Sequence, residues 1–199
     1  VVHLHPTLIN GILCCRNARN ISARLFGDKA LFLPYTDPGY ILFKTLESEI
    51  SVYREKHSTD PKIIFLENHG VFVAADTTSE IKDIDKNIIK SVEKEIPRVD
   101  KIENLPYNPV MDKVLPLIRM ILSEDKPKII RYRHNSLIAQ YYKSQQDFQK
   151  ISLPLTPDNI VYCKTRYLYI EHSSTAEKII DSFRSQLPRF KNEYGYLPK

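Results

Sequence analysis

The sequence predicts an α/β layered domain, because short apolar runs typical of buried strands alternate with segments of helical period. The runs at 62–68 and 71–74 indicate two strands, and the run at 1–5 indicates the end of another. Between them, residues 40–56 carry apolar side chains at helical spacing, and a second amphipathic stretch follows residue 77. This alternation within the first hundred residues is the basis of the fold prediction.

The helix boundaries in this part rest on local start and stop signals. Residues 7–19 are rich in apolar side chains and are predicted to be helical. Asp37-Pro38 marks a helix start, because proline fits the first turn, where its missing N–H is not needed. Thr77 and Glu80 form a capping box before the next helix, which we expect to end before Pro97.

A linker rich in proline follows, and a second alternation begins after it. Helices are predicted at 111–123, 136–143 and 176–187, and strands at 128–132, 160–162 and 167–170. We therefore divide the chain into a region 1–100 and a smaller α/β extension 101–199.

Composition restricts the function classes. The net charge is +5, but the basic residues are scattered among acidic ones, so we expect no nucleic-acid partner. No apolar run approaches the roughly 18 residues of a membrane helix, and we expect no membrane association. Three cysteines without disulfide or CxxC spacing fit a reducing cytoplasm. The chain begins inside an apolar run without an initiator methionine, so we expect further sequence upstream of Val1.

Three histidines form the candidate site. His3 and His5 stand two residues apart on a predicted strand, so both imidazoles project from the same face, while Leu4 points to the opposite face and the core. His69 ends the predicted strand 62–68 and precedes a glycine, and strand ends are where α/β sheets collect functional side chains. Imidazoles in this arrangement predict a zinc site, although an isolated HxH is usually not a metal site.

Several motifs resemble those of one known family. The run from Val1 to Pro6 resembles the V-x-H-x-H-P metal motif of the class II aldolase/adducin family, and residues 67–71 resemble its second histidine-glycine motif. The turn 34–39 falls where that family has a proline-glycine turn. Residues 25–28 and 155–162 resemble the aldolase part of two-domain proteins in which a short-chain dehydrogenase follows. No GxGxxG follows a predicted strand here, so we expect no dehydrogenase domain within the chain.

The resemblance implies a layered α/β/α domain around a central mixed sheet and a zinc-dependent aldolase. Such an enzyme cleaves a ketose 1-phosphate of the rhamnulose or fuculose type to dihydroxyacetone phosphate and an aldehyde. His3, His5 and His69 would bind Zn²⁺ or another divalent cation, whose charge stabilises an enediolate. The implied partners are a sugar phosphate and, as a homotetramer, further copies of the chain.

The catalytic base is not identified in this sequence. In the family it lies upstream of the H-x-H motif, as does the phosphate pocket, so we expect both before Val1. Glu67, two residues from His69, is a candidate substitute. The alternative is that Glu67 is a strand-end carboxylate bonded to backbone or to an imidazole N–H, a contact that would itself orient a metal ligand.

Other functions remain open on the same residues. A sugar-phosphate epimerase or dehydratase would use the same three histidines. A non-catalytic adducin-like interaction module is a third possibility, which loss of the histidine triad would have favoured. The sequence alone does not separate aldolase from epimerase.

Overall fold

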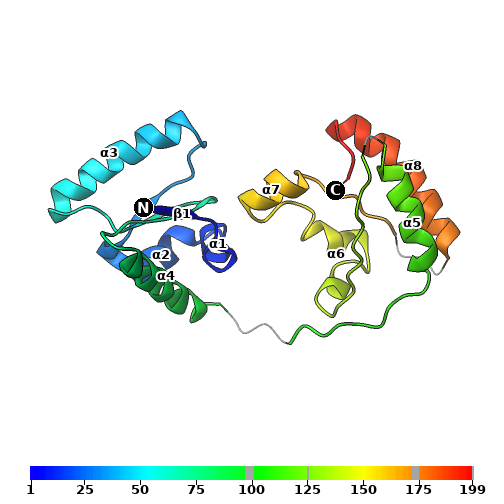
Figure 1. Ribbon diagram of the computed structural model, residues 1–199, viewed down its shortest axis with the longest axis horizontal. Coiled ribbons are helices and arrows are strands. Elements are labelled where there is room, and N and C mark those ends of the chain that lie inside the picture. The colour runs from blue at the N-terminus through cyan, green and yellow to red at the C-terminus, as the bar shows by residue number, and fades with distance from the viewer. Residues whose placement is uncertain (97–100, 125, 172–174, 199) are drawn as a thin grey trace. The chain divides into compact units, whose positions relative to one another are not determined.

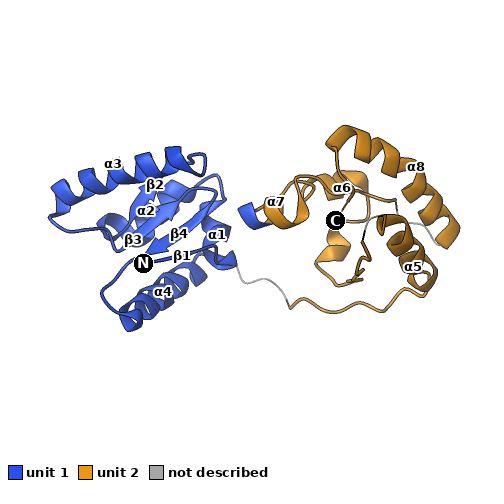
Figure 2. Ribbon diagram, turned by 45° about the horizontal axis from the view of Figure 1, so that its top comes forward, with its two compact units in different colours: residues 1–98, 156–158 blue, residues 99–155, 159–199 orange. Residues whose placement is uncertain are grey.

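The structure is a computed structural model that describes residues 1–96, 101–124, 126–171 and 175–198. The chain divides into two compact units (Figure 2). Unit 1 comprises residues 1–98 and 156–158, and unit 2 comprises residues 99–155 and 159–199. Pro97, before which the helix that follows Thr77 is expected to end, lies outside the described residues.

Unit 1 is built on a four-stranded mixed sheet. The strands are β1 (Val2–Leu4), β2 (Leu31–Leu33), β3 (Ile63–Leu66) and β4 (Gly70–Val73), in the spatial order β1-β4-β3-β2. β2 and β3 are parallel, and the other two pairs are antiparallel. The α/β class and the mixed sheet are therefore confirmed.

Helices cover both faces of this sheet, as Figures 1 and 2 show, with α3 and α4 on opposite sides of the strands. The helices of unit 1 are α1 (Thr7–Leu13), α2 (Ala18–Phe26), η1 (Gly27–Lys29), α3 (Tyr40–His57) and α4 (Thr78–Glu93). Side chains of α1, α2 and α4 pack on the face that carries Phe65 and Val71. α3 packs on the other face, against Ile64 and Leu66. Alternating side chains along β3 thus enter two different cores.

The helix starts predicted from the sequence are confirmed in position, but Pro38 lies before the N-cap residue Gly39 of α3 rather than in its first turn. α3 begins at Tyr40, after the 34–39 turn. At α4 the Thr77 side chain accepts a hydrogen bond from the Glu80 N–H at 3.2 Å, and the Glu80 carboxylate accepts one from the Asp76 N–H at 3.2 Å. The segment predicted as one helix at 7–19 is instead two helices, because the chain turns between Leu13 and Ala18.

The described part of unit 2 is built from helices and irregular segments, and is not the α/β extension predicted for residues 101–199. Its elements are α5 (Met111–Leu122), η2 (Ile138–Gln140), α6 (Gln145–Gln149), α7 (Pro157–Cys163) and α8 (Ala176–Tyr194), and α7 begins in the segment grouped with unit 1. α5 and α8 pack together around a core of Val114, Ile179 and Ile180. Within the described part of unit 2 the only strand-like pairing is an isolated bridge between Asn104 and Asn135.

The three strands predicted in the second half are wrong. Residues 128–132 and 167–170 are irregular, and 160–162 lie within α7. The predicted helix 136–143 is reduced to η2. α8 runs beyond the predicted end at residue 187 and through Pro188, because Phe190 on its next turn is buried and holds the helix against its unit. Among the described residues, no helix combines the length and apolarity needed to cross a membrane.

Candidate metal centre

Strand β1 presents His3 and His5 from the edge of the sheet. It pairs with β4 so that His3 lies opposite Phe72 and Leu4 opposite Val71. The His3 ring stacks on the Phe72 ring, with centroids 4.2 Å apart and an interplanar angle of 28°. Leu4 lies on the other face as predicted by strand alternation, but it is 41% exposed rather than part of the core.

His69 reaches the same place from the tight connection between β3 and β4. The Asn68 backbone has φ 56°, a left-handed conformation that asparagine tolerates better than most residues. The His69 N–H donates to the Leu66 carbonyl at 3.1 Å, and the Asn68 N–H donates to the Leu13 carbonyl at 3.0 Å. These bonds fix the short turn, and the turn carries the His69 ring to β1.

The structure brings the three predicted histidines together. The ring centroids are 4.9 Å apart for His3 and His5, 5.1 Å for His3 and His69, and 5.0 Å for His5 and His69. Each residue offers one ring nitrogen such that all three nitrogens lie within 4.8 Å of one another. Residues separated by more than sixty positions in the sequence thus form a nearly equilateral group of imidazoles.

Hydrogen-bond partners decide which nitrogen of each N-terminal histidine carries the proton. His3 Nδ1 lies 3.1 Å from the Val71 carbonyl oxygen, and because a carbonyl only accepts, His3 donates from Nδ1. His5 Nδ1 lies 3.4 Å from both carboxylate oxygens of Asp158, which belongs to unit 1, so it also faces an acceptor. In the neutral rings, both Nε2 atoms therefore carry lone pairs.

These two Nε2 atoms face each other at 3.1 Å. Two lone pairs at this distance repel each other unless a metal ion, or a proton on one of the rings, lies between them. Two nitrogens bound to one tetrahedral zinc ion at ~2.0–2.1 Å stand ~3.3 Å apart. The spacing and the imidazole donors therefore fit a divalent transition-metal ion.

The electrostatic surroundings favour neutral rings. Burial lowers the pKa of His3 below its usual 6.5; the Val71 carbonyl opposes this shift, and the nearby His5 adds to it. Burial also lowers the pKa of His69, with further contributions from His3 and His5. Since a metal binds the unprotonated nitrogen, lowered pKa values keep these ligands available at neutral pH.

The Glu67 carboxylate has a structural contact. Its Oε2 accepts a hydrogen bond from the Tyr35 N–H at 2.9 Å, and its own N–H donates to the Leu33 carbonyl at 3.0 Å. Glu67 thus ties the 34–39 turn to the end of β3. A role as base stays a prediction.

Sequence reasoning did not find the groups that orient the rings. The Val71 carbonyl is a backbone atom and leaves no mark in a side-chain pattern. Phe72 could have been found from the register of β1 against β4, which the sequence does not give. Asp158 lies in the stretch 155–162, which was considered for its family resemblance, and nothing local relates it to His5.

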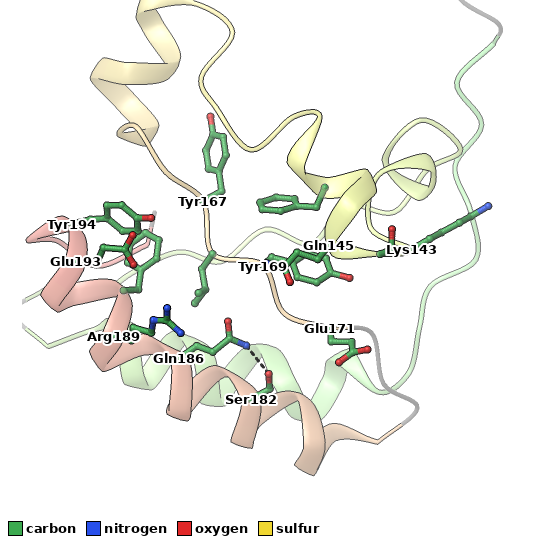
Figure 3. Close-up of a pocket in the computed structure, with 14 residues that line it drawn as sticks. Lys143, Gln145, Tyr167, Tyr169, Glu171, Ser182, Gln186, Arg189, Glu193 and Tyr194 are labelled. Carbon is green, nitrogen blue, oxygen red and sulfur yellow. Dashed lines mark hydrogen bonds between the residues drawn. The ribbon is translucent and has the colours of Figure 1, made fainter.

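Unit 2 has a cavity of about 650 Å³ with different chemistry (Figure 3). It opens between α8, the start of α6 and the segment 167–171. Its lining includes Tyr167, Tyr169, Gln186, Arg189 and Glu193. Its described lining contains the carboxylates of Glu171 and Glu193 but neither histidine nor cysteine, whereas the three clustered histidines lie in unit 1.

Comparison with known proteins gives a distant similarity. The chain is 24% identical over 210 aligned residues to a Bacillus subtilis (strain 168) protein named "Uncharacterized oxidoreductase YuxG". The alignment covers 98% of this chain and 30% of that protein, so the chain spans less than a third of the relative's length. No family model matches the chain. No solved structure matches it either.

These findings correct the family assignment made from the motifs. The class II aldolase/adducin assignment, and with it the description of the chain as a lyase or aldolase, is wrong: no family model matches, and the relative found is named an oxidoreductase. The short motifs around the histidines predicted that three imidazoles lie close together, and in the structure they do. They were not sufficient to define a family.

Proposed function

We propose that this chain is the metal-binding part of an enzyme, with His3, His5 and His69 holding one divalent cation, such as Zn²⁺. The observation that carries the proposal is the 3.1 Å approach of two Nε2 atoms whose rings both have Nδ1 against an oxygen acceptor. Bound there, a divalent cation supplies Lewis-acid polarisation of a substrate carbonyl or hydroxyl oxygen. Neutral imidazoles suit this role, because they leave the charge of the cation intact.

The chain's own residues hold the ligands in place. Phe72 stacks on one face of the His3 ring, and the Val71 carbonyl fixes its tautomer. The Asp158 carboxylate faces His5 Nδ1 and makes that ring a stronger donor through Nε2. The short β3–β4 turn places His69. Each ligand therefore has a contact that restricts its motion.

The relative is named an oxidoreductase, and we propose oxidoreduction at an oxygen-bearing carbon as the reaction of this site. Oxidation of a hydroxyl by a hydride acceptor such as a nicotinamide, or the reverse reduction of a carbonyl, passes through an oxygen with partial negative charge, which a neighbouring cation would stabilise. We propose a small polar substrate of the sugar-phosphate class for such a reaction, within a longer cytoplasmic protein. The homotetramer stays a prediction from the sequence.

Metal analysis of single variants tests the proposal. The purified chain is stripped with a chelator, reloaded with Zn²⁺, and titrated calorimetrically. We expect one ion per chain, and for His3→Ala, His5→Ala and His69→Ala a loss of affinity larger than the ~10–100-fold caused by removing an outer contact. His57→Ala is the matched control, because His57 packs on Tyr53 in α3, outside the cluster. A wild-type chain that binds no Zn²⁺, or equal binding by the His69→Ala variant, contradicts the proposal.

The reaction is then tested with the metal-loaded protein. Sugar phosphates are supplied with and without a nicotinamide cofactor, and both cofactor turnover and the release of triose phosphate are followed. Turnover of the cofactor that needs the metal supports oxidoreduction. Release of triose phosphate without cofactor would contradict oxidoreduction as the reaction. Neither product in a protein that binds the metal would contradict a sugar phosphate as the substrate.

A further inference from the structure

We propose that Gly70 is a positioning residue of the metal centre, because the His5 ring fills the space that a side chain at residue 70 would need. This inference deepens the proposed function and rests on it. A Cβ placed on Gly70 would stand 2.5 Å from His5 Cδ2 and 3.3 Å from His5 Nε2. It would also stand 2.5 Å from the Leu4 carbonyl oxygen. Contacts of 2.5 Å are far below van der Waals separation.

A lack of space for a side chain, rather than the backbone conformation, explains the glycine at residue 70. Gly27, Gly39 and Gly195 have positive φ angles, and a Cβ on any of them would meet nothing within 4 Å. Gly70 has no positive φ, so an alanine could adopt its backbone conformation. The steric conflict is with the His5 ring and the end of β1.

The register of the sheet explains why the conflict arises at this residue. β1 and β4 pair antiparallel as far as Leu4 opposite Val71, and His5 and Gly70 are the next residues beyond that pair. On the same face, His3 lies opposite Phe72 and stacks on its ring. The neighbour of His3 is therefore an aromatic ring, whereas the neighbour of His5 is an empty position over which the imidazole can lie.

This placement of the ring creates the geometry of the cluster. With the His5 ring over β4, its Nε2 lies 3.1 Å from His3 Nε2, and its centroid lies 5.0 Å from that of His69. A side chain at residue 70 would displace the ring or separate the end of β1 from β4, since the Leu4 carbonyl is backbone. Either movement takes His5 Nε2 away from the other two ligands.

The Gly70→Ala variant tests this assignment, with Gly11→Ala as its matched control. Gly11 lies in α1, has no positive φ, and has open space where a Cβ would stand. Calorimetric titration with Zn²⁺ alone should give about 10–100-fold weaker binding for Gly70→Ala, the usual effect of losing an outer contact to a ligand. Gly11→Ala should bind within about twofold of wild type. The absorption spectrum of bound Co²⁺ should change only in Gly70→Ala.

Wild-type Zn²⁺ affinity and Co²⁺ spectrum in Gly70→Ala would overturn the assignment. Because that variant could fail to fold for reasons unrelated to the ring, a double-mutant cycle is measured on the metal-free protein. Gly70→Ala should lower the thermal midpoint less in a His5→Ala background than in wild type. An equal loss in both backgrounds also overturns the role assigned to the His5 ring.

The two proposals fail in different ways. A wild-type chain that binds no Zn²⁺ defeats the proposed function and the metal role of Gly70 together. In that case the double-mutant cycle still tests whether Gly70 leaves space for the His5 ring. Tight wild-type binding with an unchanged Gly70→Ala variant defeats the Gly70 assignment alone.

Discussion

Apolar runs of similar appearance behave differently in the two units of this chain. In unit 1 the run around Ile63–Leu66 becomes β3, which lies between β2 and β4 and has three buried side chains. In unit 2 the run 128–132 forms no strand, and Ile129 in its centre is 96% exposed. The difference shows that an apolar run becomes a strand only where neighbouring strands can pair with it and a helix layer can cover it.

The presence of a paired sheet in unit 1 also explains why the histidine cluster forms there. A paired sheet fixes residues that are distant in sequence to within a few ångströms, and all three histidines stand on or beside β1, β3 and β4. Unit 2 is held by the packing of α5 against α8, and its cavity is lined by side chains from helices and irregular segments. The three histidines of the proposed metal site therefore have the rigid support of the unit 1 sheet.

The largest expected effect comes from emptying the core beneath the sheet. Phe65 is 1% exposed and packs against Phe26 at a centroid distance of 4.9 Å. Phe65→Ala should destabilise unit 1 by about 3–5 kcal/mol and abolish Zn²⁺ binding. Phe183→Ala removes a ring that is 4% exposed in α8 and should leave Zn²⁺ binding intact. Chemical denaturation followed by circular dichroism, with metal titration of each variant, measures both effects. Equal loss of binding in the two variants would contradict the separation of the units.

Metal removal should produce the next largest effect, and only in unit 1. Zn²⁺ at a hundred times its dissociation constant stabilises the folded form by about 2.7 kcal/mol. We expect the thermal transition of unit 1 to rise with Zn²⁺ and to return to the metal-free value with a chelator. His69→Ala should remove this response and His57→Ala should keep it. A shift in the transition of unit 2 instead would locate the metal elsewhere.

Removal of helix caps should have a smaller effect that also differs between the units. Thr77→Ala deletes the acceptor for the Glu80 N–H and should cost about 1 kcal/mol, because α4 carries buried residues of the main core. Ser144 caps α6 in the same way, by accepting from the Asp147 N–H at 3.1 Å. Since α6 has five residues, Ser144→Ala should loosen it locally, seen as faster amide exchange, with little change in global stability.

The smallest expected effect is a pH dependence of the metal-free protein. The pKa values of His3 and His69 are lowered, mainly by burial, so the unfolded chain binds more protons than the folded one below about pH 6.5. Stability is therefore fully present above the unfolded pKa and falls as pH drops toward the folded values. Denaturation midpoints of wild type and a His3→Ala/His69→Ala variant, measured between neutral and mildly acidic pH, check this. A midpoint that rises on acidification contradicts it.

Much of the site could be predicted from the sequence. The i, i+2 spacing of His3 and His5 on a strand fixes their common face, and the position of His69 before a glycine places it at a strand end. The groups that orient these rings could not be predicted. The Val71 carbonyl and Phe72 become neighbours of His3 through strand pairing, and Asp158 through a contact far along the chain.

The sequence by itself determined the local elements whose signals lie within one turn or one strand, such as the start of α3 and the Thr77 cap of α4. It also identified the three histidines of the candidate site. The tertiary structure decided which apolar runs became strands and which ring nitrogens face one another. It also gave the reason for a glycine at residue 70, because the His5 ring occupies the space that a side chain there would need. The physical reason is that strand pairing and side-chain packing depend on residues distant in the chain, whereas caps and helical periodicity depend on residues within a few positions.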